Sequence, residues 1–360
     1  MTALISFLLT LHVAVSGALN FERTSFDFGD HPAQERELDC DFPFINVSDH
    51  PVTISYAVAS CSCTKLTWTT DPVPPGGKGV VSARYTKERY KDSFSKQITV
   101  VVEGEAQPYF LSFSGSFHDT PASLLSDFKY KRGDILFEYD PIDLGLVSAG
   151  VEVSGRFELA NFSQQAVTLD IEDVSPGLIL SFDHTSLDPY TRTFAKYYFL
   201  PDSLVRGRVE LSFTPVVDGE SLGPVYVRAV QTDNFSALSS AQRNAGALPV
   251  LDAREYDFGT IASGQDAEIT MMLKNSSETP LHVQSMFANR PGVSFDYPDV
   301  VEGGATLPIT VTIRSEALRG GNNRFKLSLV SDSPMIPYIE TFVRGYVPDS
   351  SEQCNKGVRL

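Results

Sequence analysis

Three of the four cysteines lie near one another in the sequence and are the residues best suited to chemistry. Cys61 and Cys63 flank a single serine, and Cys40 lies on the stretch before them. Two thiols one residue apart can exchange a disulfide or bind Cu(I), whereas Zn²⁺ requires four ligands. Three interpretations stay open: a structural disulfide from Cys40 to Cys61 or Cys63, buried thiols without a role, and a redox or metal-binding site. We expect Cys354, in the polar tail, to be unpaired or to pair between chains.

No other residues are arranged for catalysis in the sequence. It contains no Gly-x-Ser-x-Gly motif, no His-Glu-x-x-His pair and no phosphate-binding glycine loop. The six histidines are scattered, and no pair of carboxylates stands out. For Trp68, the only tryptophan, we expect packing at the rim of a core, with stacking on a sugar as the alternative. We therefore predict a non-enzymatic protein without a cofactor or metal.

Two short patterns recur three times and define the elements that carry these residues. An aspartate, an apolar residue and a glycine recur at intervals of about 115 residues, which is the length of a domain rather than of a solenoid unit. The glycines are Gly29, Gly145 and Gly259. An asparagine recurs downstream with the same spacing, as Asn46, Asn161 and Asn275. We therefore predict three copies of one domain.

Each repeated asparagine ends a stretch in which apolar and charged residues alternate. In the first copy, Cys40 lies on the apolar side of this stretch, with Asp39 and Asp41 on the other. A period of two indicates a half-buried strand, so Cys40 should be buried. A second alternating strand follows each asparagine across a turn rich in Asn, Ser, Asp, Gln and Pro.

Further short strands follow, separated by turns that contain glycine and proline. They are expected at residues 80–85, 98–103, 109–115, 194–200, 209–213, 225–230, 307–313, 325–330 and 338–345. There is no convincing amphipathic helix, only polar stretches such as residues 236–244. This pattern is typical of an antiparallel two-sheet sandwich. We predict an all-β fold of three tandem immunoglobulin-like domains.

The repeats also set the predicted domain limits. The domains span residues 19–118, 134–232 and 247–347, with a leader at residues 1–18 and a polar tail at residues 348–360. The net charge is −16, which disfavours a nucleic-acid partner because phosphate binding needs basic patches. The excess of acidic residues is expected to favour solubility.

The predicted leader has the features of a secretory signal peptide. Residues 1–18 carry no charged side chain, residues 3–15 are apolar, and Ser16-Gly17-Ala18 supplies small residues for cleavage after Ala18. The alternative is a buried first strand of the first copy. The apolar run is too short to span a bilayer, and we expect no transmembrane segment in the mature chain. Export would permit disulfides.

The first copy resembles a known family. The segments Phe42-Pro-Phe-Ile-Asn46, Ser60-Cys61-Ser62-Cys63-Thr64 and Pro75-Gly76 are similar to the bacterial domain of unknown function numbered 1573, mainly over residues 20–117. That family usually has glycine where this chain has Ser62. The other copies resemble related immunoglobulin-like domains of the ASPM, SPD and hydin type. The resemblance implies an immunoglobulin-like sandwich and an exported protein of the Bacteroidetes type, in the periplasm or at the outer surface of a Gram-negative bacterium. It implies no catalytic residues.

Four Asn-x-Ser sequons are present, at Asn46, Asn161, Asn234 and Asn275. They would suggest glycosylation in a eukaryotic secreted protein. Three of them share one position of the repeat, so a structural role for the asparagine in the turn is the preferred interpretation.

These patterns favour an exported binding or scaffold protein that contacts an unknown protein partner through edge strands or end loops. One alternative is a thiol-redox or metal-binding protein that uses Cys61 and Cys63. A second alternative is a glycan-binding module, with Trp68 as the stacking residue.

Overall fold

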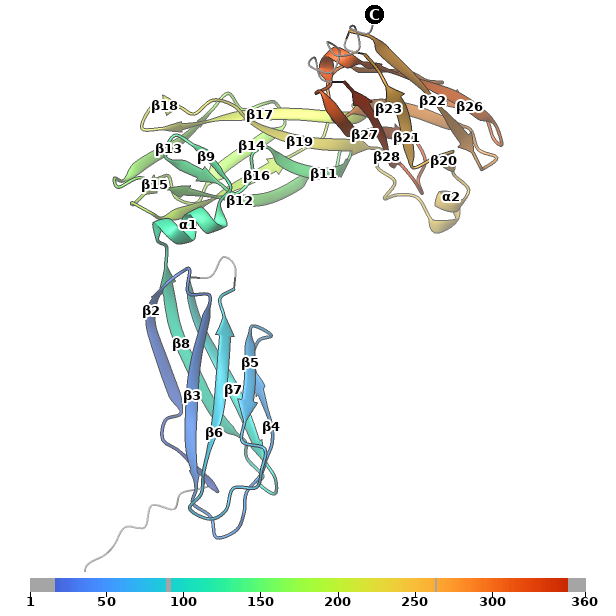
Figure 1. Ribbon diagram of the computed structural model, residues 1–360. Helices are drawn as coiled ribbons and strands as arrows, with labels where there is room; N and C mark the ends of the chain where they lie inside the picture. The colour runs from blue at the N-terminus through green and yellow to red at the C-terminus, as the bar shows by residue number, and fades with distance from the viewer. Residues whose placement is uncertain (1–16, 89–91, 263, 349–360) are drawn as a thin grey trace, which may run out of the picture. The chain divides into compact units, whose positions relative to one another are not determined.

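The computed structural model describes residues 17–88, 92–262 and 264–348, and these residues form six β-sheets with little helix (Figure 1). The chain divides into two compact units, Met1–Phe128 and Lys129–Leu360. Residues 1–16 of the predicted leader and Cys354 lie outside the described residues. The all-β prediction is confirmed.

The first unit contains two four-stranded sheets around one hydrophobic core. Their strand orders are β1-β3-β6-β5 and β2-β8-β7-β4. The elements are β1 (Leu19–Phe21), β2 (Ser25–Pro32), β3 (Glu37–Asn46), β4 (Ile54–Ala59), β5 (Thr64–Trp68), β6 (Lys78–Thr86), β7 (Ser93–Val102), β8 (Tyr109–His118) and α1 (Pro121–Asp127). Alternate side chains of both sheets meet in the core, where Phe42, Phe44 and Ile98 are almost fully buried. This arrangement is why the sequence alternates with a period of two.

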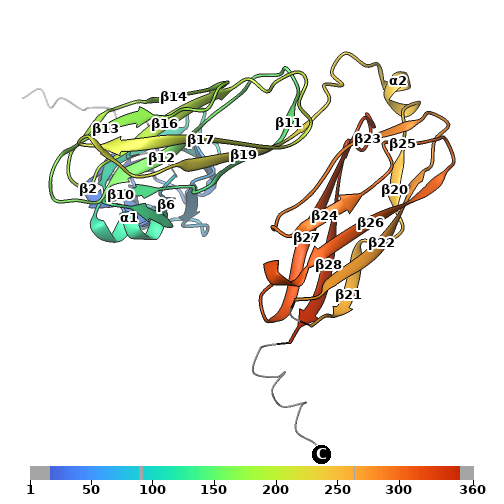
Figure 2. The same ribbon diagram turned by 90° about the horizontal axis from the view of Figure 1, so that it is seen from above.

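The second unit contains four sheets and two separate hydrophobic clusters among its described residues (Figure 2). The sheets of the second copy have the orders β14-β16-β12-β10-β9 and β11-β19-β17-β13-β15, and those of the third copy have the orders β20-β22-β26-β24 and β21-β28-β27-β23-β25. The second copy has β9 (Tyr130–Arg132), β10 (Ile135–Phe137), β11 (Ile142–Ser148), β12 (Val153–Asn161), β13 (Val167–Glu172), β14 (Leu178–Phe182), β15 (Ser186–Leu187), β16 (Arg192–Phe199), β17 (Gly207–Val217), β18 (Glu220–Ser221) and β19 (Val225–Thr232). After α2 (Ser240–Asn244), the third copy has β20 (Pro249–Leu251), β21 (Glu255–Thr260), β22 (Asp266–Asn275), β23 (Leu281–Ala288), β24 (Val293–Asp296), β25 (Val300–Val301), β26 (Thr306–Arg314), the short helix η1 (Ser315–Ala317), β27 (Gly321–Ser331) and β28 (Tyr338–Val347). The domain limits drawn from the sequence stay a prediction.

The sheets are not purely antiparallel as the sequence pattern suggested. In each copy an early strand pairs in parallel with the last strand: β2 with β8, β11 with β19, and β21 with β28. Alternation along a strand reveals which face is buried, but it does not identify the neighbouring strand or its direction. The parallel pairs therefore could not be read from periodicity alone.

The repeated glycines lie at an irregularity in these parallel pairs. Gly29, Gly145 and Gly259 have φ angles of +75°, +67° and +72°. Each glycine N–H donates to the carboxylate of the aspartate two residues earlier, at 3.0, 2.8 and 2.8 Å. The register of each pair shifts at this point. The Asp-x-Gly motif thus encodes a bulge whose positive φ angle favours glycine.

Two short helices, α1 and α2, lie in the segments between the predicted domain limits. Thr120 and Ser123 form a capping box at the start of α1, and Pro121 is its first residue. Ser239 and Gln242 form a similar box at α2. Capping of this kind stabilises helices too short to persist alone. No helix in the described part of the chain is long and apolar enough to cross a membrane.

Candidate functional site

Cys61 and Cys63 lie in the turn that connects β4 to β5. Cys61 and Cys63 form a disulfide, with their Cα atoms 5.3 Å apart. The carbonyl of Cys63 accepts a hydrogen bond from the N–H of Thr86 at 2.9 Å. The sulfur of Cys61 lies 3.4 Å from the hydroxyl oxygen of Thr64. Both cysteines are partly exposed, so the disulfide is held by the sheets and also reaches solvent.

Cys40 is a free, buried thiol on β3. Burial, with the nearby Asp41 carboxylate as a smaller cause, raises its pKa to about 12. The Cys40 disulfide considered from the sequence is not the pairing found. The reason is topological, because β6 lies between β3 and β5, and Cys40 pairs in register with Ala83 of β6. A buried neutral thiol of this kind packs like a small apolar residue.

The other copies build the equivalent turn from Pro176-Gly177 and Pro291-Gly292, without cysteines. Gly177 and Gly292 have positive φ angles there, +82° and +76°. A disulfide therefore replaces a proline–glycine turn in the first copy. Because it closes a loop of only three residues, the loop-entropy relation gives it about 1.5 kcal/mol of stabilisation, well below a disulfide that closes a long loop. Fixing the turn, more than stabilising the whole sandwich, is the effect this pairing can have.

The strand that leads into this turn presents an apolar outer surface. Tyr56 and Val58 of β4 are 51% and 53% exposed, and Phe110 of β8 is 55% exposed. Val58 pairs with Thr99 of β7, which pairs in turn with Phe110, so one row across the sheet faces outward. We call Tyr56, Val58 and Phe110 the β4 patch. It was not identified from the sequence.

β4 is also the free edge of its sheet. No strand of the described chain pairs with the other side of residues 54–59, and the only contact of this type is the isolated bridge between Val52 and Val73. No residue of β4 is charged. Exposed edges normally carry charges, prolines or covering segments that prevent pairing with other chains. β4 has a small register irregularity near Ile54 but no charge or proline.

The equivalent strands of the other copies differ from β4 in an informative way. β13 carries two carboxylates, Asp170 and Glu172. β23 has no Asp, Glu, Lys or Arg, but it lies against β17. The two strands approach closely at Gly207 of β17 and Ser285 of β23, where a Cβ added to the glycine would be 2.3 Å from the serine hydroxyl oxygen. One equivalent edge is therefore charged, and the other is in contact with a neighbouring strand. β4 is uncharged, and the strand beside it is β5 of its own copy, with which it does not pair.

Asn46, the repeated asparagine of the first copy, is fully buried and holds neighbouring segments together through hydrogen bonds. Its Nδ2 donates to the carbonyls of His50 and Val73, both at 2.8 Å. Its Oδ1 accepts the N–H of Ser48 at 2.9 Å. One side chain thus ties the end of β3 to the next turn and to the segment before β6.

The other copies repeat these contacts. Asn161 and Asn275, also fully buried, each donate from Nδ2 to two carbonyls at equivalent places and accept the N–H of the serine two residues later. The Nδ2 and Oδ1 atoms of each asparagine therefore already have hydrogen-bond partners within the protein. A glycan attached to Nδ2 at any of these three sequons would break the hydrogen bonds that this nitrogen donates.

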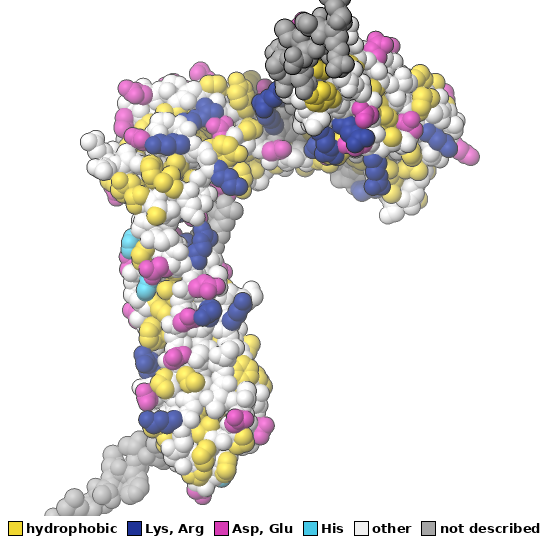
Figure 3. All heavy atoms as spheres, viewed as in Figure 1, with side chains coloured by type: hydrophobic (Ala, Val, Ile, Leu, Met, Phe, Trp, Pro, Cys, Tyr) yellow, Lys and Arg dark blue, Asp and Glu magenta, His cyan; other side chains and the backbone are white. Residues whose placement is uncertain are grey.

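The remaining sequence candidates do not form a site. Trp68 is partly buried against the core of the first unit. No group of three or more His, Cys, Asp or Glu side chains within the described ranges is placed to hold a metal ion. In the view of Figure 3, acidic and basic side chains are interspersed over the visible face of the first unit, with no large area of one sign.

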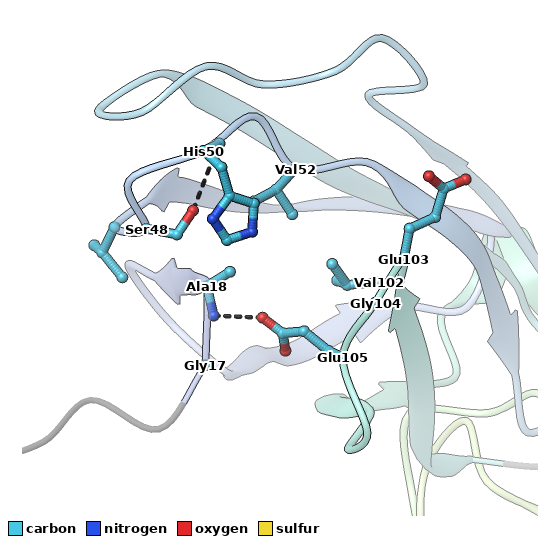
Figure 4. A pocket seen from close by; sticks show the side chains of 10 residues that line it. Gly17, Ala18, Ser48, His50, Val52, Val102, Glu103, Gly104 and Glu105 are labelled. Carbon is cyan, nitrogen blue, oxygen red and sulfur yellow. Dashed lines mark hydrogen bonds between the residues drawn. The ribbon is translucent and has the colours of Figure 1, made fainter.

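A shallow hollow lies at the end of the first unit where the described chain begins (Figure 4). It has a volume of about 490 Å³ and is lined by residues that include Ala18, Ser48, His50 and Glu105. The Glu105 carboxylate points at the backbone nitrogen of Ala18 and accepts its hydrogen bond. The hollow is open and mixed in polarity, unlike the enclosed apolar pockets that bind most small ligands.

Residues 19–117 match the model of a family described as "Protein of unknown function (DUF1573)". The match covers the first copy alone. The match confirms the resemblance seen in its strand, cysteine and turn segments. The matched residues include β4, the disulfide turn and most of the lining of the hollow. No curated protein matches the sequence.

Several solved structures are similar to the chain. A protein of unknown function from Porphyromonas gingivalis W83 is 14% identical with a TM-score of 0.49, covering 59% of this chain and 100% of that one. A PapD-like domain of human CEP192 is 11% identical with a TM-score of 0.26, covering 29% and 89%. The endo-fucoidan hydrolase MfFcnA4 of glycoside hydrolase family 107 is 12% identical with a TM-score of 0.25, covering 92% and 44%.

Proposed function

We propose that this chain is an exported, non-enzymatic binding protein whose DUF1573 domain captures an extended segment of a partner protein at the free edge of β4. The observation that carries the proposal is the combination, on one strand, of an unpaired edge, an uncharged sequence and an apolar outer face. Strand addition uses these features, because main-chain hydrogen bonds supply affinity and alternate side chains supply specificity.

The hydrogen-bond pattern of β4 indicates which groups would bind the partner. The N–H of Ser60 donates to the carbonyl of Gln97 on β7. Backbone groups of successive strand residues point to opposite sides, so those of Ala57 and Ala59 face away from β7. An added strand would pair with these two residues. Its side chains on the outer face would then lie beside Tyr56 and Val58, which favours apolar or β-branched residues at alternate positions.

The comparison between copies supports the same reading. β23 is the other uncharged equivalent of β4, and it lies against β17 of the preceding copy. The charged equivalent, β13, carries the carboxylates expected of an edge that faces water. In this comparison the uncharged strand β23 is covered by a strand of another copy. A segment of the partner protein would cover the uncharged strand β4 in the same way.

A displayed library of random peptides tests the proposal with the full mature chain as bait. We expect selected peptides to alternate apolar and polar residues and to lose binding to Ala57→Pro, which removes an outward N–H without removing a bond to β7. Val58→Lys should also abolish binding. Asp170→Lys, on the equivalent strand β13, is the matched control and should bind as the unchanged chain does. Trp68 fluorescence verifies that Ala57→Pro and Val58→Lys leave the first unit folded, and circular dichroism verifies the folding of Asp170→Lys.

Two results would overturn the proposal. One is the absence of any enriched peptide. The other is enrichment of peptides that bind Ala57→Pro and Val58→Lys as well as the unchanged chain. Amide hydrogen exchange with a selected peptide gives an independent check, because protection must appear in residues 54–59.

Thiol–disulfide exchange at Cys61 and Cys63 is a second candidate, favoured by the partial exposure of a disulfide that closes a very short loop. In this reaction a thiolate of a dithiol reductant attacks one sulfur to give a mixed disulfide. Its second thiolate then releases the reduced cysteine pair and the oxidised reductant. A redox titration against reduced and oxidised dithiothreitol, a dithiol, tests it, and a pair that stays oxidised throughout the titration excludes it.

A further inference from the structure

We infer that the mature chain begins at Ala18 and that its new α-ammonium group is bound by the carboxylate of Glu105. The inference rests on the export included in the proposed function. It assigns a processing site one residue earlier than the cleavage after Ala18 that the sequence pattern suggested.

The contacts at this site converge on one carboxylate oxygen. Oε1 of Glu105 accepts the N–H of Ala18 at 2.5 Å and the hydroxyl of Tyr109 at 3.1 Å. The same hydroxyl accepts the N–H of Leu19 at 3.0 Å. Burial raises the pKa of Tyr109 to about 12, so its hydroxyl stays protonated and can donate to Glu105. The carboxylate thus lies where a positive charge on the nitrogen of Ala18 would form a charge-assisted hydrogen bond.

The third copy shows what an uninterrupted chain uses at the same place. Leu248 occupies the equivalent position, one residue before β20, and donates its N–H to the neutral side chain of Asn275 at 3.3 Å. An internal peptide N–H needs only a neutral acceptor. A carboxylate gains most from a cation, and hydrolysis of the peptide bond before Ala18 would provide one.

A backbone bond shared by all three copies identifies Ala18 as the first residue to be retained. The carbonyl of Ala18 accepts the N–H of Val47 at 2.9 Å. Asp134 and Leu248 make the same bond in the second and third copies, each at 2.8 Å. Ala18 also packs against the core. Cleavage after Ala18 would remove this bond from the first copy and leave the Val47 N–H without its acceptor, whereas cleavage before Ala18 preserves the bond.

The residue immediately before the bond fits a signal peptidase. The reaction is a hydrolysis in which water adds across the Gly17–Ala18 peptide bond, leaving a carboxylate on Gly17 and an ammonium group on Ala18. Gly17 supplies the small residue that such peptidases require immediately before the cleaved bond. In an uncleaved chain, a Cβ at Gly17 would lie 2.3 Å from the hydroxyl oxygen of Tyr109.

The first experiment is to produce the full chain with its leader in a Gram-negative host and to determine the N-terminal residue of the exported protein. We expect Ala18. Export with Leu19 or Gly17 as the first residue would overturn this inference and leave export intact. Protein that stays in the cytoplasm with residues 1–18 attached would overturn both. Gly17→Ala should yield a mature protein of unchanged mass, because the altered residue is removed with the leader.

The second experiment tests the role of Glu105 in the exported protein. The pH dependence of acylation of the α-amine reports its protonation. Glu105→Gln keeps the shape of the side chain but removes its charge, so we expect the α-amine to be acylated several-fold faster at neutral pH. Glu103→Gln is the matched control, because Glu103 lies in the same turn and its carboxylate points away from Ala18 (Figure 4). Equal rates in both variants would overturn the assignment.

Discussion

Replacing Asn46 with alanine should destabilise the first unit and leave the second unit unaffected. The substitution removes the two bonds from Nδ2 to the carbonyls of His50 and Val73 and the two bonds that Oδ1 accepts from the N–H and the hydroxyl of Ser48. Each such bond contributes about 1 kcal/mol net, and buried groups left without a partner add to the loss. We therefore expect the free energy of unfolding of the first unit to fall by about 3–4 kcal/mol, a large part of the total for a domain of this size.

Tryptophan fluorescence can test this prediction. Trp68 is the only tryptophan and lies on β5, so its fluorescence during urea denaturation reports the first unit within the complete protein. Asn161→Ala removes the equivalent contacts in the second copy and should leave the Trp68 transition unchanged. Asn234→Ala, at an exposed sequon, should change the unfolding free energy by less than about 0.5 kcal/mol.

A second substitution separates hydrogen bonding from packing at this position. Asn46→Asp keeps the acceptor for Ser48 but places a carboxylate against two carbonyl oxygens. Burial and these oxygens raise the pKa of the new carboxyl, so its stability relative to the unchanged chain should improve as the pH falls and a proton allows one donated bond. The reasoning is refuted if Asn46→Ala costs less than about 1 kcal/mol, or if Asn161→Ala shifts the Trp68 transition equally.

Two further predictions concern the cysteines of the first unit. The pKa of Cys40 is raised to about 12, so the protein should lose stability, relative to Cys40→Ala, as the pH rises from about 9 toward 12. Its thiol should react with iodoacetamide only after unfolding, and rapid labelling of the folded protein would contradict the burial argument. Replacing Cys61 and Cys63 together by serine should lower the free energy of unfolding by about 1.5 kcal/mol in the Trp68 assay. A loss above about 4 kcal/mol would mean that the disulfide holds more than its own turn.

The long strands could be predicted from the sequence because each alternates over eight or more residues. β3 and β22 show this, since apolar and polar residues alternate along most of their length. The short edge strands β5, β14 and β24 were missed. Strands of four or five residues between turns carry too few alternations to distinguish them from loops.

The candidate sites depended on contacts between distant parts of the chain. Ala18 and Glu105 are 87 residues apart, and no pattern in the sequence connects them. The disulfide partner of Cys61 likewise depended on which strand separates β3 from β5. The β4 edge did leave a signal, because residues 54–59 contain no charge whereas the equivalent β13 contains two carboxylates. Comparing the copies strand by strand would have revealed it.

The parallel pairing of β2 with β8 has a mechanical consequence. Because the two strands run in the same direction, the chain enters β2 at one end of the pair and leaves β8 at the other. Tension applied to the ends of the copy pulls these neighbours in opposite directions along their length. The hydrogen bonds between them then carry the load together in shear and do not open one after another as in a zipper. β11 with β19 and β21 with β28 have the same arrangement, so every copy should resist being pulled apart more strongly than its thermal stability alone would indicate.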